Sequence, residues 1–277
     1  MITAGTELLQ KLYSEGYYIE RQREFGIKDW GKSISNGIKN WRVNHLKKSI
    51  SKAKQNRVSI QKKINELDSK VIQNPKLERA IQREAINERA AVIKGKGNST
   101  EVLTDPDIKS NKLFQVSSAN ISKRNKKKLY NLLKDRDYQI NYNRDKGGPA
   151  SLAHEIGHIK AMNDPGEAGK ISRDVNSRVR HKVFENDITI DKGNNKREWD
   201  NSVIRERKLE RKQLIENEKD ASNRGLDLMK KSGASKEEIK HAKKTLKLAR
   251  KDYKNLGDIY VNTAKIKKIN PNELLDN

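Results

Sequence analysis

Apolar residues between 41 and 72 recur at alternating spacings of four and three, which places them on one side of a helix. The seam comprises Leu46, Ile50, Ala53, Ile60, Ile64, Leu67 and Val71. Arg57 stands at the position where an apolar residue is missing. This stripe is typical of a helix that packs along another helix, as in a coiled coil. The remaining faces are rich in lysine, so the same helix could also bind an anionic partner.

Three more helices follow from the same kind of pattern. One begins at Pro75 and runs to about residue 92, and we expect it to fold back on the first as an antiparallel hairpin. A long helix covers 200–231 and ends at Ser232 and Gly233. Ser235 and Glu238 form a capping box for a helix over 235–254. Gly257 then separates a short tail helix.

Residues 138–142 alternate between polar and apolar side chains, which favours one half-buried strand. In many zinc peptidases such a strand precedes the metal-binding helix, and its backbone pairs with an extended substrate. The predicted fold class is therefore mainly α with a small β element. The predicted organisation is a basic helical N-terminal region over 1–95, a linker over 96–120, and a second domain over 121–277.

Composition and charge indicate which partners and which metal ligands the protein could use. The 277 residues are 33% hydrophobic, 35% charged and 5% aromatic, and carry a net charge of +24. That excess suits nucleic acid or another anionic surface as a partner. The alternative is that the lysine and arginine side chains only form the water-exposed faces of long helices. Because cysteine is absent, any metal site must use histidine and carboxylate ligands.

The sequence also bears on location. It has no run of about 18 apolar residues, which argues against a transmembrane helix, and we see no signal peptide at the start. The compartment stays open, with the cytoplasm, a virion or delivery as an effector all compatible.

The most specific chemistry lies in an H-E-x-x-H motif formed by His154, Glu155 and His158. On a helix the two histidines share one face and can bind the same zinc ion, while the glutamate can act as general base on a zinc-bound water. The alternative is a chance match on a polar helix. Gly148 is a plausible N-cap and Pro149 suits the first turn of such a helix.

A catalytic zinc ion needs a third protein ligand. Asp164 lies at a spacing used by some metzincins, but Ala161 replaces the glycine that permits the required turn. On the helix over 200–231, Glu218 shares a face with apolar residues whereas Glu216 points to solvent. Glu218 is therefore the favoured ligand, and a buried ion pair with Arg or Lys is its alternative role.

The sequence from Glu218 onward resembles that of the bacterial neutral zinc metallopeptidases of the YugP type. The matching pattern is Glu218-x-x-Ala221-Ser222-x-Arg224, followed by Gly233 and by further matching residues as far as Leu246. The resemblance covers about residues 138–265. It implies a gluzincin, zincin-like peptidase domain in which His154, His158 and Glu218 bind Zn²⁺ and Glu155 is catalytic. Members of that family usually carry transmembrane segments, and this chain departs from them there.

The resulting hypothesis is a zinc metalloendopeptidase that cleaves a protein substrate. An oxyanion-stabilising residue would also be needed, and His181, Arg224, His241 and Tyr253 are candidates by residue type. A second hypothesis is a viral or mobile-element structural or packaging protein that binds nucleic acid through its basic helices, with a vestigial or structural metal site. A third is a delivered effector with a peptidase domain behind a helical adaptor.

Overall fold

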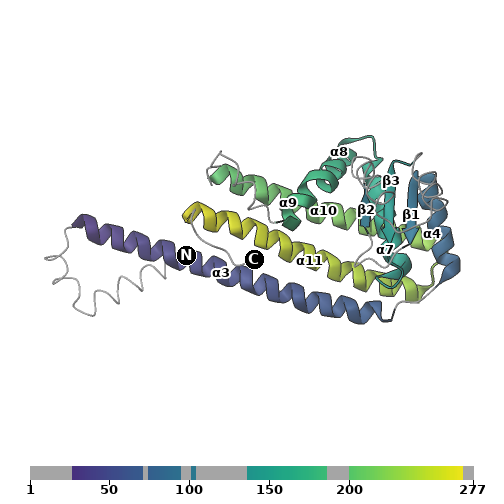
Figure 1. Ribbon diagram of the computed structural model, residues 1–277, viewed down its shortest axis with the longest axis horizontal. Helices are drawn as coiled ribbons and strands as arrows, with labels where there is room; N and C mark the ends of the chain where they lie inside the picture. The colour runs from purple at the N-terminus through teal and green to yellow at the C-terminus, as the bar shows by residue number, and fades with distance from the viewer. Residues whose placement is uncertain (1–26, 71–73, 95–100, 104–135, 186–199, 271–277) are drawn as a thin grey trace, which may run out of the picture.

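The computed structural model describes residues 27–70, 74–94, 101–103, 136–185 and 200–270. Over these residues the protein is mainly helical with one small sheet, which confirms the predicted fold class (Figure 1). The elements in chain order are α3 (Ile27–Asp68), α4 (Pro75–Asn87), β1 (Ala90–Lys94), β2 (Glu101–Leu103), β3 (Tyr138–Tyr142), α7 (Gly148–Met162), α8 (Glu167–Asp174), the π-helix η1 (Val175–Val179), α9 (Arg180–Glu185), α10 (Asn201–Lys231) and α11 (Lys236–Ile269).

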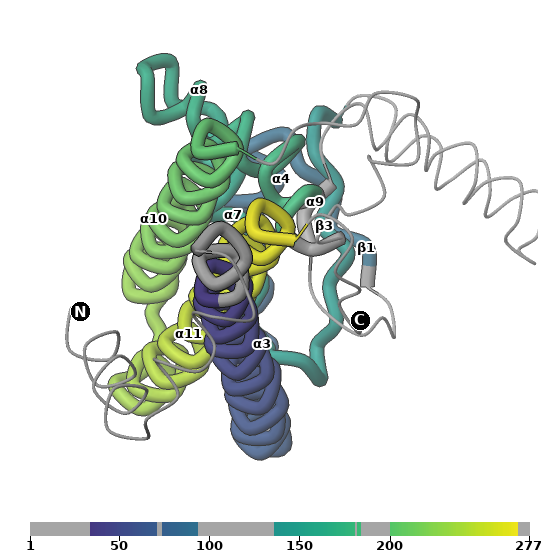
Figure 2. The backbone as a smooth tube through the Cα atoms, turned by 90° about the vertical axis from the view of Figure 1, so that its left-hand side faces the viewer, coloured from purple at the N-terminus to yellow at the C-terminus, as the bar shows by residue number. Residues whose placement is uncertain are grey.

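The three longest helices lie side by side, with α11 between α3 and α10 (Figures 1 and 2). Val43 and Ile50 of α3 are buried in one cluster with Ile259 and Ile266 of α11. The apolar seam of α3 therefore packs on a neighbouring helix, as its spacing predicts.

Arg57 explains the interruption in that seam. Its Nε and Nη2 atoms donate to the two carboxylate oxygens of Asp252 on α11, at 2.9 and 3.2 Å. A two-point contact of this kind fixes both groups in one plane. The charged residue thus has a specific partner on the facing helix.

Two expectations about these helices are wrong. α3 and α4 do not pack together as a hairpin, because α3 lies along α11 while α4 packs on α7 and β1. Gly257 does not interrupt the last helix, since α11 continues through it. A glycine in a helix costs only about 1 kcal/mol, and a Cβ atom at this position would lie 2.6 Å from Cγ of Arg211. Here the glycine permits the close approach of α10 and α11.

β3 is confirmed at the predicted residues and forms the centre of a three-stranded sheet in the order β1-β3-β2. It pairs in parallel with β1, where Val92 faces Ile140, and antiparallel with β2. α4 ends earlier than expected, and Arg89, with a φ of 57°, turns the chain into β1. Because both edges of β3 are already paired, an extended substrate would have to use another edge, contrary to the expectation for this strand.

Several predicted segments lie outside the described residues. The run of lysine and arginine after residue 121 predicts a basic helix over 121–136, and a short strand is possible over 187–190. Nearly all of that helix, the strand and most of the linker over 96–120 are outside the described residues. The domain division stays a prediction. α4 and β1, which precede the proposed boundary, pack on α7 and β3, which follow it. In the described part of the chain, no helix has both the length and the apolarity needed to span a bilayer.

Candidate metal centre

The H-E-x-x-H motif lies in the middle of α7, a helix that is buried on nearly every side. It begins one residue earlier than the sequence indicates. Gly147 is the N-cap at a φ of 77°, Gly148 is the first helical residue and Pro149 follows it. Leu152, Ile156 and other apolar residues of α7 join a core with the sheet and α4. Such a helix holds its polar side chains in fixed positions because it is covered all round.

α10 crosses α7 at close range and brings Glu218 to the two histidines. A Cβ atom on Gly157 would lie 2.2 Å from the backbone oxygen of Ala221, and one on Gly225 would lie 2.8 Å from that of Ala153. Small residues on both helices therefore allow the two backbones almost to touch. Glu218 is only 1% exposed, whereas Glu216 on the same helix is exposed, as the helical period predicts.

The donor atoms of His154, His158 and Glu218 converge on one point. The two Nε2 atoms are 3.1 Å apart, and Nε2 of His154 lies 3.2 Å from Oε2 of Glu218. Nε2 of His158 lies 3.6 Å from Oε1 of the same carboxylate. Ligand atoms about 2.1 Å from a tetrahedral zinc ion are about 3.4 Å from one another. The three residues thus have the spacing of a zinc site with one position left for another ligand.

Two carboxylate oxygens in this region lack a hydrogen bond. They are Oε1 of Glu218 and Oε2 of Glu155, and both atoms are buried. An unsatisfied buried carboxylate oxygen is costly, and it marks a place where a cation or a proton donor fits. The donor set, its spacing and these open acceptor atoms all suit a divalent metal ion.

The negative charge of Glu218 also suits a divalent metal ion in the cluster. Burial opposes a charge on His154, but the hydrogen bond and the charge of Glu218 outweigh it and raise the pKa of His154. Burial would also raise the pKa of Glu218, yet His158 and His154 hold that pKa well below its ordinary range. Glu218 is therefore an ionised carboxylate that draws positive charge into the site.

A second layer of side chains orients the imidazoles. Oγ of Ser222 lies 3.4 Å from Nδ1 of His154 and donates to the backbone oxygen of Glu218 at 2.7 Å. The amide of Asn217 lies 3.3 Å from Nδ1 of His158 and contacts the Ser172 hydroxyl at 2.9 Å. Because the Ser222 proton goes to Glu218, Oγ of Ser222 can accept from Nδ1–H of His154, which leaves Nε2 of His154 as the metal-binding atom. The Asn217 contact restrains the ring of His158. Asn217 and Ser222 follow the helical face of Glu218, so the sequence could have indicated them.

Arg180 and Tyr253 form a polar pair beside the cluster. Nη2 of Arg180 donates to the Tyr253 hydroxyl at 2.9 Å. Both residues lie within electrostatic range of Glu155 and Glu218. Burial and these two carboxylates keep the pKa of Tyr253 above its ordinary value, so its hydroxyl remains a neutral donor. Tyr253 was a candidate by type, whereas Arg180 carried no signal in the sequence.

Three other candidates, Asp164, Arg224 and His241, make contacts outside the cluster. Oδ1 of Asp164 accepts from the backbone N–H of Gly166, as expected for a residue that ends a helix. Arg224 pairs with Asp220 on its own helix at 2.7 Å. His241 contacts the backbone oxygen of Leu67 and so joins α11 to α3. His181 lies in α9.

Comparison of the chain with protein-family models, curated proteins and solved structures finds no match in any of the three. The resemblance to the YugP-type metallopeptidases therefore stays a prediction.

Proposed function

We propose that the protein is a zinc-dependent peptidase in which His154, His158 and Glu218 hold the ion. The observation that carries this proposal is the convergence of their donor atoms at 3.1, 3.2 and 3.6 Å in a buried site. Zinc at such a site supplies a Lewis acid that activates water and polarises a carbonyl group.

Glu155 is proposed as the general base. It follows the first ligand on α7, is buried, and keeps one carboxylate oxygen without a hydrogen bond. That oxygen can accept a proton from a water molecule and then deliver it to the leaving amine. A purely structural zinc site needs no such carboxylate, which favours the enzyme over a vestigial or structural site.

Arg180 and Tyr253 are proposed to stabilise negative charge on the substrate carbonyl oxygen. The tyrosine contributes a neutral O–H donor, and the guanidinium beside it contributes a permanent positive charge. Donors fixed before the reaction stabilise the developing oxyanion without a reorganisation cost. The pair comes from α9 and α11, so it depends on elements outside the motif itself.

The proposal is tested by measuring zinc content and peptide cleavage together in four proteins. The wild type should bind one equivalent of zinc and cut a proteome-derived peptide library, with products identified by mass spectrometry. Glu155→Gln should keep the zinc and lose cleavage by about 100-fold or more. Glu218→Ala should lose the zinc, because two histidines alone leave the ion poorly held.

Glu216→Ala is the matched control, since Glu216 is an exposed glutamate on the same helix. It should retain both zinc and activity. A wild type that binds no zinc after loading, or that leaves the whole library uncut, would contradict the proposal.

A further inference from the structure

One side of α11 consists of lysine alone over its first five turns. The residues within a stripe about 100° wide, at 3.6 residues per turn, are Lys236, Lys240, Lys243, Lys244, Lys247, Lys251 and Lys254. We call this set the lysine face. All seven side chains are exposed. From Lys236 to Lys254 the stripe extends about 27 Å along a straight helix.

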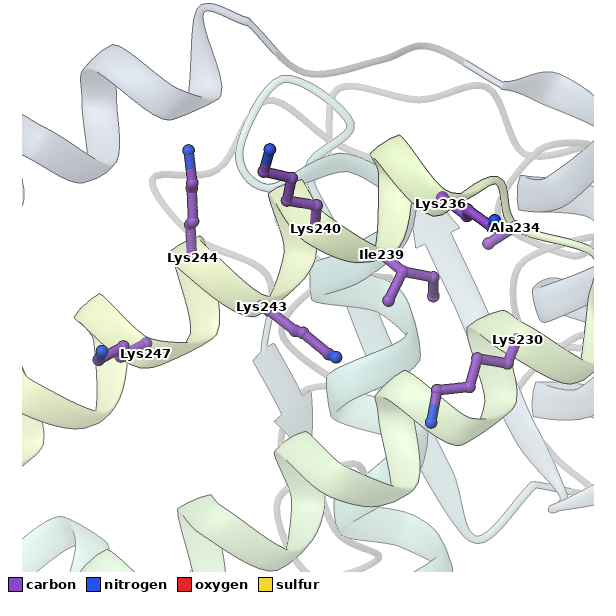
Figure 3. A pocket seen from close by; sticks show the side chains of 8 residues that line it. All are labelled: Lys230, Ala234, Lys236, Ile239, Lys240, Lys243, Lys244 and Lys247. Carbon is purple, nitrogen blue, oxygen red and sulfur yellow. The ribbon is translucent and has the colours of Figure 1, made fainter.

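The first part of the lysine face lines a groove of about 600 Å³ at the turn between α10 and α11. Its lining residues are Lys230, Ala234, Lys236, Ile239, Lys240, Lys243, Lys244 and Lys247. Figure 3 shows Lys243 extending toward α10, where Lys230 lies, while Lys240 and Lys244 project from another side of α11. The groove therefore combines a small apolar floor with ammonium groups from both helices.

Among the residues that the structure describes, none that lines the groove is acidic. Of the lining lysines, Lys230 donates to Asp227 at 2.8 Å. Within the described part of the chain, no carboxylate forms an ion pair with any of the seven lysines of the face. Like charges held so close repel one another, and a bound polyanion relieves that repulsion.

We propose that the lysine face and its groove bind duplex nucleic acid through the phosphate backbone. A stripe about 27 Å long matches an extended polyanion, and a duplex presents one charge per about 1.7 Å of its axis. The described residues that line the groove include no aromatic side chain on which bases could stack, which disfavours single strands. Lysine side chains without base-reading partners indicate binding that does not depend on sequence.

The packing of α11 argues against a membrane surface as the partner. Helices that lie on membranes insert an apolar face below their basic one. Along the lysine face, Ala242 and Leu246 of α11 are buried, and Ile239 packs against the core that contains Met229 of α10. Farther along α11, Ile259 and Ile266 are buried in one cluster with residues of α3. Only its charged side is free to meet a partner.

The test is fluorescence anisotropy with a labelled 24-base-pair DNA duplex and the full chain, in sodium chloride from 50 to 300 mM. The triple substitution Lys240→Gln, Lys244→Gln and Lys247→Gln should weaken binding at 100 mM salt by at least 10-fold. It should also reduce the slope of log affinity against log salt by about 2.7, for three lost phosphate contacts.

The control carries the same charge change on the back of α3, as Lys48→Gln, Lys52→Gln and Lys63→Gln. It should weaken binding by less than threefold. Equal losses in the two triple variants would overturn the proposal, because net charge rather than the lysine face would then govern binding. The proposal also fails if polyglutamate or phosphatidylserine vesicles displace the duplex at equal charge concentration. Thermal melting of each variant verifies that it is folded.

Discussion

At the scale of single residues, the candidate centre depends on the side chains that surround the H-E-x-x-H motif. His154 and His158 are one helical turn apart, so their shared face follows from the sequence alone. Their ring orientation instead depends on Ser222 and Asn217, and the neighbouring positive charge depends on Arg180. These three residues come from two other helices.

The Arg180–Tyr253 pair leads to a prediction about catalysis. Tyr253→Phe removes a donor proposed to contact the substrate carbonyl oxygen, so kcat should fall by about 10- to 1,000-fold while KM changes little. Zinc content should be unchanged, since Tyr253 is not a ligand. Tyr138→Phe is the control, because its hydroxyl donates to Asn163 at the far end of α7. Equal kcat values for the wild type and Tyr253→Phe would remove the tyrosine from the mechanism.

At the scale of secondary structure, the close contact between α7 and α10 sets the geometry of the centre. Ala221 and Gly225 are small residues on the face of α10 that carries Glu218, a pattern that lets another helix approach. The structure identifies that helix as α7 and adds Gly157, inside the motif, as the opposing small residue. The helical period assigns residues to a face, but it does not say which helix meets that face.

Gly157→Ala tests the contact. Its methyl group would overlap the backbone oxygen of Ala221, so α7 and α10 would have to separate. We expect the free energy of unfolding, measured with urea, to fall by about 1–3 kcal/mol, and zinc affinity to fall with it. Gly37→Ala in α3 is the control, because nothing lies within 4 Å of its Cβ position. It should gain about 0.5–1 kcal/mol from helix propensity. A Gly157→Ala protein as stable as the wild type would refute the close approach.

At the scale of the whole molecule, α11 joins α10, which carries part of the candidate metal centre, to α3. It packs on α3 through one side and on α10 through another, and its third side is the lysine face. Part of the basic character seen in the composition is therefore gathered on one side of this helix, while its apolar residues serve two separate contacts. α3 is thereby part of the same packed body as the helices that carry the candidate metal centre.

Two truncations on α3 test whether that helix docks on α11. Ile50→Ala removes buried atoms from the contact and should lower the free energy of unfolding by about 2–4 kcal/mol. Val58→Ala lies on the same helix at a side chain 72% exposed, so its effect should stay within about 0.5 kcal/mol. The measurement is urea denaturation followed by circular dichroism. Two equally small effects would show that α3 stands apart from α11.

The sequence by itself determined the local features of this protein. Helical and strand periods and capping chemistry involve neighbouring residues only. They account for the position of α10, the capping box of α11, the strand β3 and the inward face of Glu218. For the same reason the motif already predicts that His154 and His158 share a face.

Only the tertiary structure decided which surfaces meet. Three features depend on residues far apart in the chain. They are the packing of α3 on α11 rather than on α4, the continuation of α11 through Gly257, and the position of Arg180 within electrostatic range of Glu155. Such contacts form because apolar faces of matching shape bury one another, and a local pattern does not specify its partner. The three donor atoms of the candidate metal centre come within 3.1 to 3.6 Å of one another as a consequence of that packing.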